Sequence, residues 1–156
     1  MSPSAASGQP GQGSPYVIRE FKFPDDYPHV LRLWSTAGSG IHLRRSDEPG
    51  EIEKKLQRDA DLFLVAESGG KIIGSVLGGF DGRRGIVYHL AVDETYRLQG
   101  VGSRLMEELE NRLRQKGCIR YYLLVTRDNE QAIRFYEARG WRNMDDLYAY
   151  GKDING

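Results

Sequence analysis

Apolar and polar positions along the chain follow two periods, a short alternation typical of strands and a spacing of three or four residues typical of helices. Several short stretches are rich in β-branched, aliphatic and aromatic residues and therefore predict strands. These are residues 16–23, 62–67, 71–80, 85–92, 119–126 and, for one or two closing strands, 141–151. Stretches with helical spacing lie between them, so the sequence predicts an α/β protein with a mixed sheet.

Helical spacing is strongest in residues 101–116, where apolar residues recur every four positions and fall near one helix face. These residues are Val101, Leu105, Leu109 and Leu113. The glutamates at 107–110 precede the basic residues at 112–116, which is the order that the helix dipole favours. Gly117 follows as a typical residue for ending a helix, so a helix over 101–116 is predicted.

Other helices are predicted with shorter patterns. They run from residues 24–26 to the glycines at 38–40, over residues 51–59, and from a cap at Asp128 or Asn129 to Gly140. Residues 41–50 have no apolar period, and few apolar positions anchor the 41–60 region. This region is interpreted either as a substrate lid or, more commonly for such segments, as a surface connection.

Turns between the strands predict how the strands pair. The Ser-Gly-Gly sequence at 68–70 indicates a tight hairpin, so the strands on either side are expected to be antiparallel. A second turn at 81–85 extends this hairpin into a meander. If the helix at 101–116 is a crossover, the strand at 119–126 must be parallel to the strand at 85–92.

Length and composition limit the possible functions. The 156 residues predict one domain at 16–151, between a Gly-, Pro- and Ser-rich tail at 1–15 and a short tail at 152–156. Lys and Arg number 22, as do Asp and Glu, so neither nucleic-acid nor membrane binding is expected. With no spanning stretch or secretory signal, a cytoplasmic protein is expected. The single cysteine, Cys118, excludes an internal disulfide and a Cys-based zinc site, and no residue is assigned to a metal.

The stretch Arg-Leu-Gln-Gly-Val-Gly at 97–102 joins a predicted strand to the strongest predicted helix. Glycine lets a backbone approach a phosphate without an obstructing Cβ, and the N–H groups of a first helical turn supply hydrogen-bond donors. The stretch therefore predicts an anion site, although a plain turn explains the local sequence equally well. A P-loop would place Lys after Gly102, where Ser103 stands, and a dinucleotide fingerprint would place a third glycine at Leu105. Both nucleotide-binding classes are disfavoured.

A second motif, Asn-x-x-Ala-x-x-Phe-Tyr-x-x-x-Gly-Trp, occupies residues 129–141. Together with Arg-x-x-Gly-x-Gly and the order of elements, it resembles the GNAT superfamily of N-acetyltransferases over residues 16–151. The run from Asp61 to Asp81, with Arg84, is most similar to the small bacterial YpeA-type acetyltransferases. The resemblance implies the GNAT fold, a central and mostly antiparallel sheet with one splayed parallel pair of strands, flanked by helices.

The resemblance also implies acetyl-CoA as co-substrate. In the family, the pyrophosphate lies on backbone N–H groups of the Gly-rich loop, and the main chain of the preceding strand holds the acetyl and pantetheine groups. Asn129 would bond the pantetheine arm, although from the residues alone it is also a good helix cap. The implied cofactor-binding residues are Leu90, Ala91, Val92, Arg97, Leu98, Gln99, Gly100, Val101, Gly102, Ser103, Asn129 and Tyr136.

Tyr136 is implied by the resemblance to be the general acid for the leaving thiolate, whereas core packing is the simpler interpretation of the residue alone. The general base stays open between Tyr88 and His89. Neighbouring strand residues point to opposite faces, so only one of the two is expected to face the cleft. A base acting through water from Glu48 or Asp81 is a further alternative.

The implied activity is transfer of an acetyl group from acetyl-CoA to a primary amine of a small molecule, peptide or protein, by direct attack in a ternary complex. A non-catalytic acyl-CoA sensor and an interaction module on the same scaffold are the alternatives, and a monomer and a homodimer both stay open. Ribosomal-protein Nα-acetyltransferases of the family have Glu five residues before the motif Asn, where this chain has Leu124, so that subfamily is disfavoured. Cys118 lies outside both motifs and is interpreted as packing.

Overall fold

A computed structural model describes residues 16–36 and 43–154 of the chain. The predicted tail at 1–15, the predicted helix end at 38–40 and the last two residues of the tail at 152–156 lie outside the described residues. The chain forms two compact units, which divide between Leu124 and Val125. The first unit contains the sheet, and the second contains one helix and an irregular C-terminal stretch.

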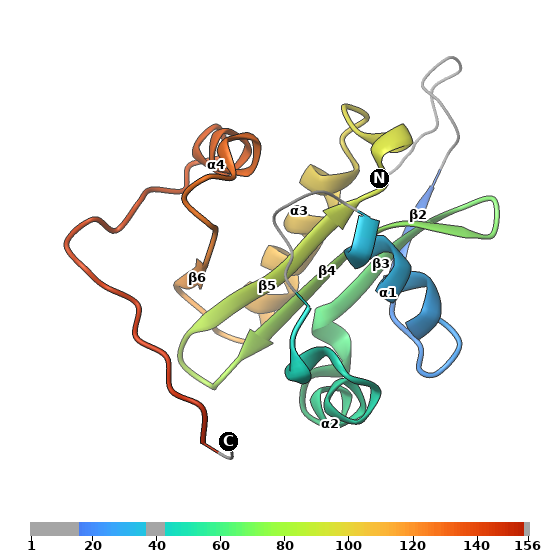
Figure 1. The fold of residues 1–156 in the computed structure, drawn as a ribbon, viewed down its shortest axis with the longest axis horizontal. Helices are drawn as coiled ribbons and strands as arrows, with labels where there is room; N and C mark the ends of the chain where they lie inside the picture. Colours follow the sequence, from blue (N-terminus) through green and yellow to red (C-terminus); the bar gives the residue numbers. More distant parts are fainter. Residues whose placement is uncertain (1–15, 37–42, 155–156) are drawn as a thin grey trace. The chain divides into compact units, whose positions relative to one another are not determined.

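A five-stranded mixed sheet organises the first unit (Figure 1). Its strands lie in the order β2-β3-β4-β5-β6, antiparallel except for the parallel pair β5 and β6. The strands are β2 (Val17–Glu20), β3 (Phe63–Ser68), β4 (Lys71–Phe80), β5 (Gly85–Val92) and β6 (Tyr121–Leu123). The predicted fold class, the hairpin between β3 and β4 and the parallel partner of β5 are all confirmed. β6 is shorter than the predicted 119–126 strand.

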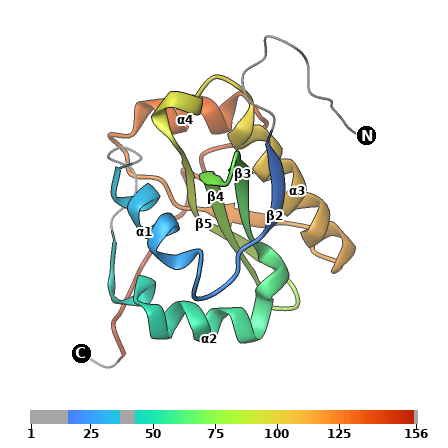
Figure 2. The same cartoon turned by 90° about the vertical axis from the view of Figure 1, so that its right-hand side faces the viewer.

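Helices cover both faces of this sheet (Figure 2). They are α1 (Tyr27–Thr36), α2 (Pro49–Asp59) and α3 (Val101–Gln115), and short 3-10 turns precede α2, β3 and α3. On β4, a Cβ at Gly78 would contact Leu109 of α3, whereas a Cβ at Gly79 would approach Lys55 of α2. Neighbouring strand residues point to opposite faces, so α3 covers one face and α2 the other. No helix among the described residues is both long and apolar enough to cross a membrane.

The core on the face of α1 is built around aromatic side chains. Trp34 of α1 and Phe21 both stack on Phe63 of β3, with ring centroids 6.0 and 4.1 Å from it. The indole N–H of Trp34 donates to the Ser75 hydroxyl on β4 at 3.1 Å, so this buried polar group is satisfied. The close packing fixes α1 against the sheet, where the Trp34 ring also contacts His89 of β5.

β5 extends beyond its parallel partner. It runs to Val92, but the register with β6 covers only Gly85 to Val87. On its other edge, β5 continues to pair with β4 as far as Val92. One edge of the second half of β5 therefore has no ladder partner within residues 43–124, which matches the splayed pair expected for the GNAT fold.

The second unit contains α4 (Glu130–Glu137). Gly140, with a φ of 91°, follows the helix end as predicted. The predicted closing strands at 141–151 are wrong, since these residues form no strand. A turn in which the Leu147 N–H donates to the Met144 carbonyl interrupts the stretch, and its alternating tyrosines, Tyr148 and Tyr150, stack on each other. Alternation alone does not make a strand, because a strand also needs a neighbour that pairs with its backbone.

Candidate active site

The Gly-rich loop connects the free end of β5 to α3. Gly100 is the N-cap residue of α3 and has a φ of 82°, and no side chain caps the helix. The first α3 bond, from the Arg104 N–H to the Gly100 carbonyl, places Val101, Gly102 and Ser103 in the first turn, where a helix offers no acceptor for its N–H groups. Leu98, with a φ of 65°, directs its side chain fully into solvent. The loop thus presents backbone donors, which is the arrangement that an anion site requires.

Asp93 and Arg97 fix the start of this loop. The Asp93 carboxylate accepts hydrogen bonds from the backbone and the hydroxyl of Thr95, at 2.9 and 2.7 Å, and lies 3.3 Å from the Lys71 ammonium. The hydrogen bonds from Thr95 have the largest effect and the Lys71 ammonium a smaller one, and both lower the pKa of Asp93. The Arg97 Nε donates to the Val92 carbonyl at 3.3 Å, so this side chain also anchors the loop to the end of β5.

A β-bulge on β5 decides where Tyr88 and His89 point. Val76 of β4 pairs with Leu90, but Gly78 pairs with Val87, so β5 has one extra residue opposite β4. A bulge interrupts the alternation of side chains along a strand. The expected alternation, by which Tyr88 and His89 would point to opposite faces, is therefore wrong.

Both side chains lie on the face covered by α1 and α2. A Cβ at Gly79 would lie 3.4 Å from the Tyr88 ring and 3.2 Å from the Lys55 ammonium, so Tyr88 projects to the face covered by α2. The His89 ring packs edge-on against Trp34 of α1 at 4.7 Å between centroids. Tyr88 is 51% exposed, and burial, with the charge of Asp59, raises the pKa of its phenol.

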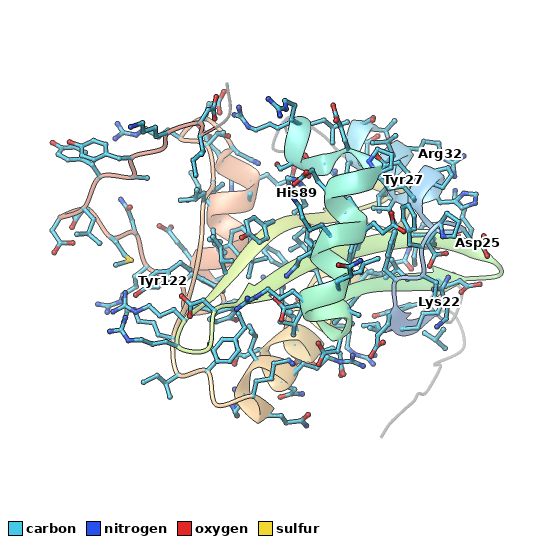
Figure 3. The ribbon with its side chains drawn as sticks, turned by 90° about the horizontal axis from the view of Figure 1, so that it is seen from below. Lys22, Asp25, Tyr27, Arg32, His89 and Tyr122 are labelled. Carbon is cyan, nitrogen blue, oxygen red and sulfur yellow. The ribbon has the colours of Figure 1, made fainter. Side chains whose placement is uncertain are left out.

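His89 forms a close pair with Asp47. Figure 3 labels the His89 side chain. Its Nε2 lies 2.9 Å from Asp47 Oδ1, and the Asp47 side chain is only 7% exposed. In a neutral imidazole, a carboxylate beside Nε2 favours the tautomer that carries its proton there, with Nδ1 as the acceptor. A histidine held in one tautomer by a buried carboxylate has the arrangement of a general base.

Asp47 was not identified from the sequence, and its environment corrects the view of 41–60 as poorly anchored. Its second carboxylate oxygen accepts from the Arg44 N–H at 3.1 Å, and its carbonyl accepts from the Tyr27 hydroxyl at 2.9 Å. Ile52 of α2 is buried in the core that includes Trp34. Burial and the negative charges of Asp47 and Glu48 raise the pKa of Tyr27. The segment has no apolar period, so no local pattern indicates these contacts.

The family model for the acetyltransferase (GNAT) family matches residues 27–141 of the chain. The chain belongs to this family. An acetyltransferase of Sodalis glossinidius is 40% identical over 138 residues, covering 88% of this chain and 94% of that protein. An acetyltransferase of Pectobacterium atrosepticum is 41% identical over 129 residues, covering 82% and 89%. The resemblance to GNAT enzymes and the expected enzyme class, an N-acetyltransferase, are thereby confirmed.

Solved GNAT structures share the fold. Ard1 from Thermoplasma volcanium matches with a TM-score of 0.70 and 29% identity, covering 80% of this chain and 81% of that one. The PaiA N-acetyltransferase from Thermoplasma acidophilum, in complex with coenzyme A, matches with a TM-score of 0.70 and 20% identity, covering 82% and 90%. At that identity the second match shows the fold alone.

Two predicted GNAT site residues belong to the second unit. Asn129 caps α4, because its side-chain oxygen accepts the Ala132 N–H at 3.1 Å, which confirms the capping interpretation. Tyr136 makes edge-on contacts with Phe135 and Trp141 at 5.2 and 5.8 Å between centroids. Burial raises the pKa of Tyr136 to about 12, so its hydroxyl remains protonated and available as a donor at neutral pH.

The remaining sequence candidates fit the GNAT site less well. Glu48 is exposed at the N-terminus of α2. Asp81 accepts the backbone N–H groups of Arg83 and Arg84 at 2.8 Å, and these bonds lower its pKa, which makes it a weaker base. Cys118 is half-buried, and its Sγ lies 3.1 Å from a Cβ built at Gly85. Its surroundings agree with packing.

Proposed function

We propose that this GNAT protein transfers the acetyl group of acetyl-CoA to a primary amine of a small molecule, peptide or protein, by direct attack in a ternary complex. The observation that carries the proposal is the His89–Asp47 pair. His89 lies on β5, just beyond Val87, the last residue that pairs with β6. The same strand then continues into the Gly-rich loop. Donor-binding backbone and a candidate base are therefore supplied by one strand.

The donor would be held mainly by backbone. In this proposal the N–H groups from Leu98 to Ser103 bind the pyrophosphate, with Arg97 beside them, and the main chain from Leu90 to Val92 binds the acetyl and pantetheine amides. Gly100 and the start of α3 without a side-chain cap support this assignment, because no side chain competes for the anion. Asn129 is proposed to bond the pantetheine arm in addition to capping α4.

His89 is proposed as the general base. Its Nδ1 would accept the proton that the amine loses, while Asp47 stabilises the imidazolium and keeps the ring in place. Deprotonating a lysine ammonium at pH 7 costs about 4.6 kcal/mol, and deprotonating an α-amino group costs about 1 kcal/mol. A base of this kind is therefore most effective for an α-amino group, because the remaining cost is small.

Tyr136 is proposed to stabilise the leaving thiolate. Acetyl-CoA supplies an activated acyl group as a thioester: the amine nitrogen bonds to the carbonyl carbon, the carbon–sulfur bond breaks, and the sulfur leaves with the electron pair. A thiol has an ordinary pKa of about 8.5, well below that of Tyr136, so hydrogen-bond donation is favoured over complete proton transfer. Ionisation of Tyr136 should then cause no loss of activity between about pH 8 and 10.

The test is a screen of amines and free-N-terminal peptides with acetyl-CoA, in which released thiol and acetylated product are both measured. Thiol release in step with product formation is expected. Tyr136→Phe should keep the acetyl-CoA affinity measured by calorimetry and lower kcat by about tenfold or more. Binding of acetyl-CoA without turnover of any amine would instead indicate a sensor, and no heat on titration with CoA would indicate an interaction module.

A further inference from the structure

An arginine-rich surface lies on the same face of the sheet as Tyr88 and His89. Ile86 and Tyr88 both lie 3.4 Å from a Cβ built at Gly79, on the side of Lys55 in α2. Tyr122 of β6 is the register partner of Ile86. In a parallel pair, register partners project to the same face, so the Tyr122 ring belongs to the face of α2. Tyr88 and the Tyr122 ring thus lie on the same face of the sheet.

Two guanidinium groups gather around the Tyr122 ring. The Arg84 Nη1 donates to the Tyr122 hydroxyl at 2.8 Å, and its carbon Cζ lies 5.6 Å from the ring centroid. The Cζ of Arg120 lies 5.4 Å from the same centroid. Both guanidinium groups thus contact the same ring, and cation–π attraction favours these positions. We name Arg84, Arg120 and Tyr122 the arginine–tyrosine surface.

Arg84 has donors left for a ligand. Its side chain is exposed, and within residues 16–36 and 43–124 no carboxylate forms an ion pair with it. A guanidinium has five N–H donors, of which the Tyr122 hydroxyl accepts one. The bond to Tyr122 also orients the group, so less conformational entropy is lost when it binds a carboxylate.

The carboxylates of Asp59 and Asp81 have partners other than Arg84. Asp59 lies 2.9 Å from the Lys55 ammonium, and its Oδ2 also accepts from the Phe80 N–H at 3.4 Å. Asp81 accepts the two backbone N–H groups of the β4–β5 turn. Both carboxylates are engaged by other partners, so neither takes up the remaining donors of Arg84.

The distance to the candidate base sets the size of the ligand. Ile86, opposite Tyr122, precedes His89 by three residues, and across the bulge this corresponds to roughly 8 Å along the strand. An extended peptide advances about 3.3–3.6 Å per residue, and a Glu side chain adds a few ångströms more. An amine at His89 and a carboxylate at Arg84 therefore fit a peptide whose second or third residue is acidic.

We propose that the arginine–tyrosine surface is an acceptor subsite, and that the preferred acceptor is a peptide or protein with a free α-amino group and an acidic side chain at its second or third residue. The inference rests on the proposed function, because it takes His89 as the point where the amine reacts. The proposed subsite adds the class of acceptor, about which the Gly-rich loop gives no information.

The test compares two tetrapeptide amides, Ala-Ala-Glu-Ala and Ala-Ala-Gln-Ala, as acceptors for the full-length protein. The Glu peptide should have a kcat/KM about fivefold higher at low salt, the size expected of a partly exposed charge pair, and the preference should shrink as salt is added. Arg84→Gln should reduce the ratio to about one, and Arg84→Glu should favour Ala-Ala-Lys-Ala instead. Arg83→Gln, at the neighbouring exposed arginine, is the matched control and should keep the preference.

Equal rates for the Glu and Gln peptides in the wild type, or a preference that survives Arg84→Gln, would overturn the subsite while acetyl transfer itself stands. If neither peptide is acetylated but another amine is, the peptide assignment is wrong and the proposed function is retained. If no amine releases thiol from acetyl-CoA, the proposed function itself fails. Circular dichroism and thermal unfolding of each variant separate a lost contact from a lost fold.

Discussion

The two ends of the second half of β5 are built by different means. At its C-terminal end, the chain leaves Val92 for a loop in which backbone N–H groups and a left-handed glycine form the candidate anion site. Three residues earlier, His89 depends on a side chain from a distant segment, Asp47, for its orientation. The Gly-rich loop is formed by local backbone conformation, whereas the His89–Asp47 pair is formed by a contact between segments far apart in the sequence.

This difference predicts different sensitivities to mutation. A backbone site tolerates many changes of side chain but not a group that occupies or repels the ligand. A side-chain pair tolerates changes in its surroundings but not the loss of either partner. Mutations at each end of β5 should therefore affect different kinetic constants, and this separation is what the following experiments test.

The largest effect is expected for Gly102→Glu in the first turn of α3. The new carboxylate would repel the pyrophosphate and fill its place, so the Kd for CoA should rise at least about 100-fold, or roughly 2.7 kcal/mol. An acidic residue near a helix N-terminus stabilises the helix itself, so the variant should fold normally. Calorimetric titration with CoA measures the affinity, and thermal unfolding checks the fold.

Gly50→Glu is the matched control for this prediction. Gly50 lies in the first turn of α2, and a Cβ there meets nothing within 4 Å. The same charge is therefore introduced at another helix N-terminus without a clash, and CoA affinity should be unchanged. Unaltered affinity in Gly102→Glu would show that the pyrophosphate binds elsewhere.

Local patterns explain why the loop half of the candidate site, with β5 and α3 on either side of it, could be predicted from the sequence. The run from 85 to 92 and the four-residue spacing from 101 to 113 set β5 and α3, and the glycines between them set the loop. Each signal acts within a few residues, so no knowledge of distant contacts is needed. The bounds of β5 agree with the prediction at both ends.

The other half depends on contacts that no local pattern contains. The bulge at Tyr88 and His89 follows from the register between β4 and β5, which period-two alternation does not predict. Asp47 reaches His89 across 42 residues of sequence, from a segment without apolar period. The prediction of closing strands at 141–151 is wrong for the same reason, because alternation is a local pattern whereas strand pairing depends on distant residues.

An intermediate effect is expected for the His89–Asp47 pair. His89→Ala should lower kcat/KM by about 100- to 1,000-fold, because the base is lost, while the Kd for CoA changes little. Added imidazole should restore part of the activity, which a purely structural role would not allow. Asp47→Asn keeps the shape of the side chain and should lower kcat by about tenfold, mainly through the orientation of the ring.

The outcome for these variants separates chemistry from stability. His89 packs on Trp34, so His89→Ala also leaves a gap, and His89→Gln is a fuller replacement that should show the same kinetic loss. A loss in kcat/KM that follows only the fall in thermal stability, without rescue by imidazole, would argue against His89 as the base. An equal weakening of CoA binding would argue against the division of labour along β5.

The smallest effect is expected for Tyr88→Phe, although Tyr88 faces the same side as His89. Burial and the charge of Asp59 raise the pKa of its phenol above the usual value near 10, so the residue is neutral at ordinary assay pH and cannot accept the amine proton. Removing the hydroxyl should leave kcat/KM within about twofold, with an unchanged profile between about pH 6 and 9. A loss comparable to that of His89→Ala would instead make Tyr88 the essential group, and Asp47 would then serve only to anchor its segment. The bulge puts both rings on one face, so only their proton chemistry tells them apart.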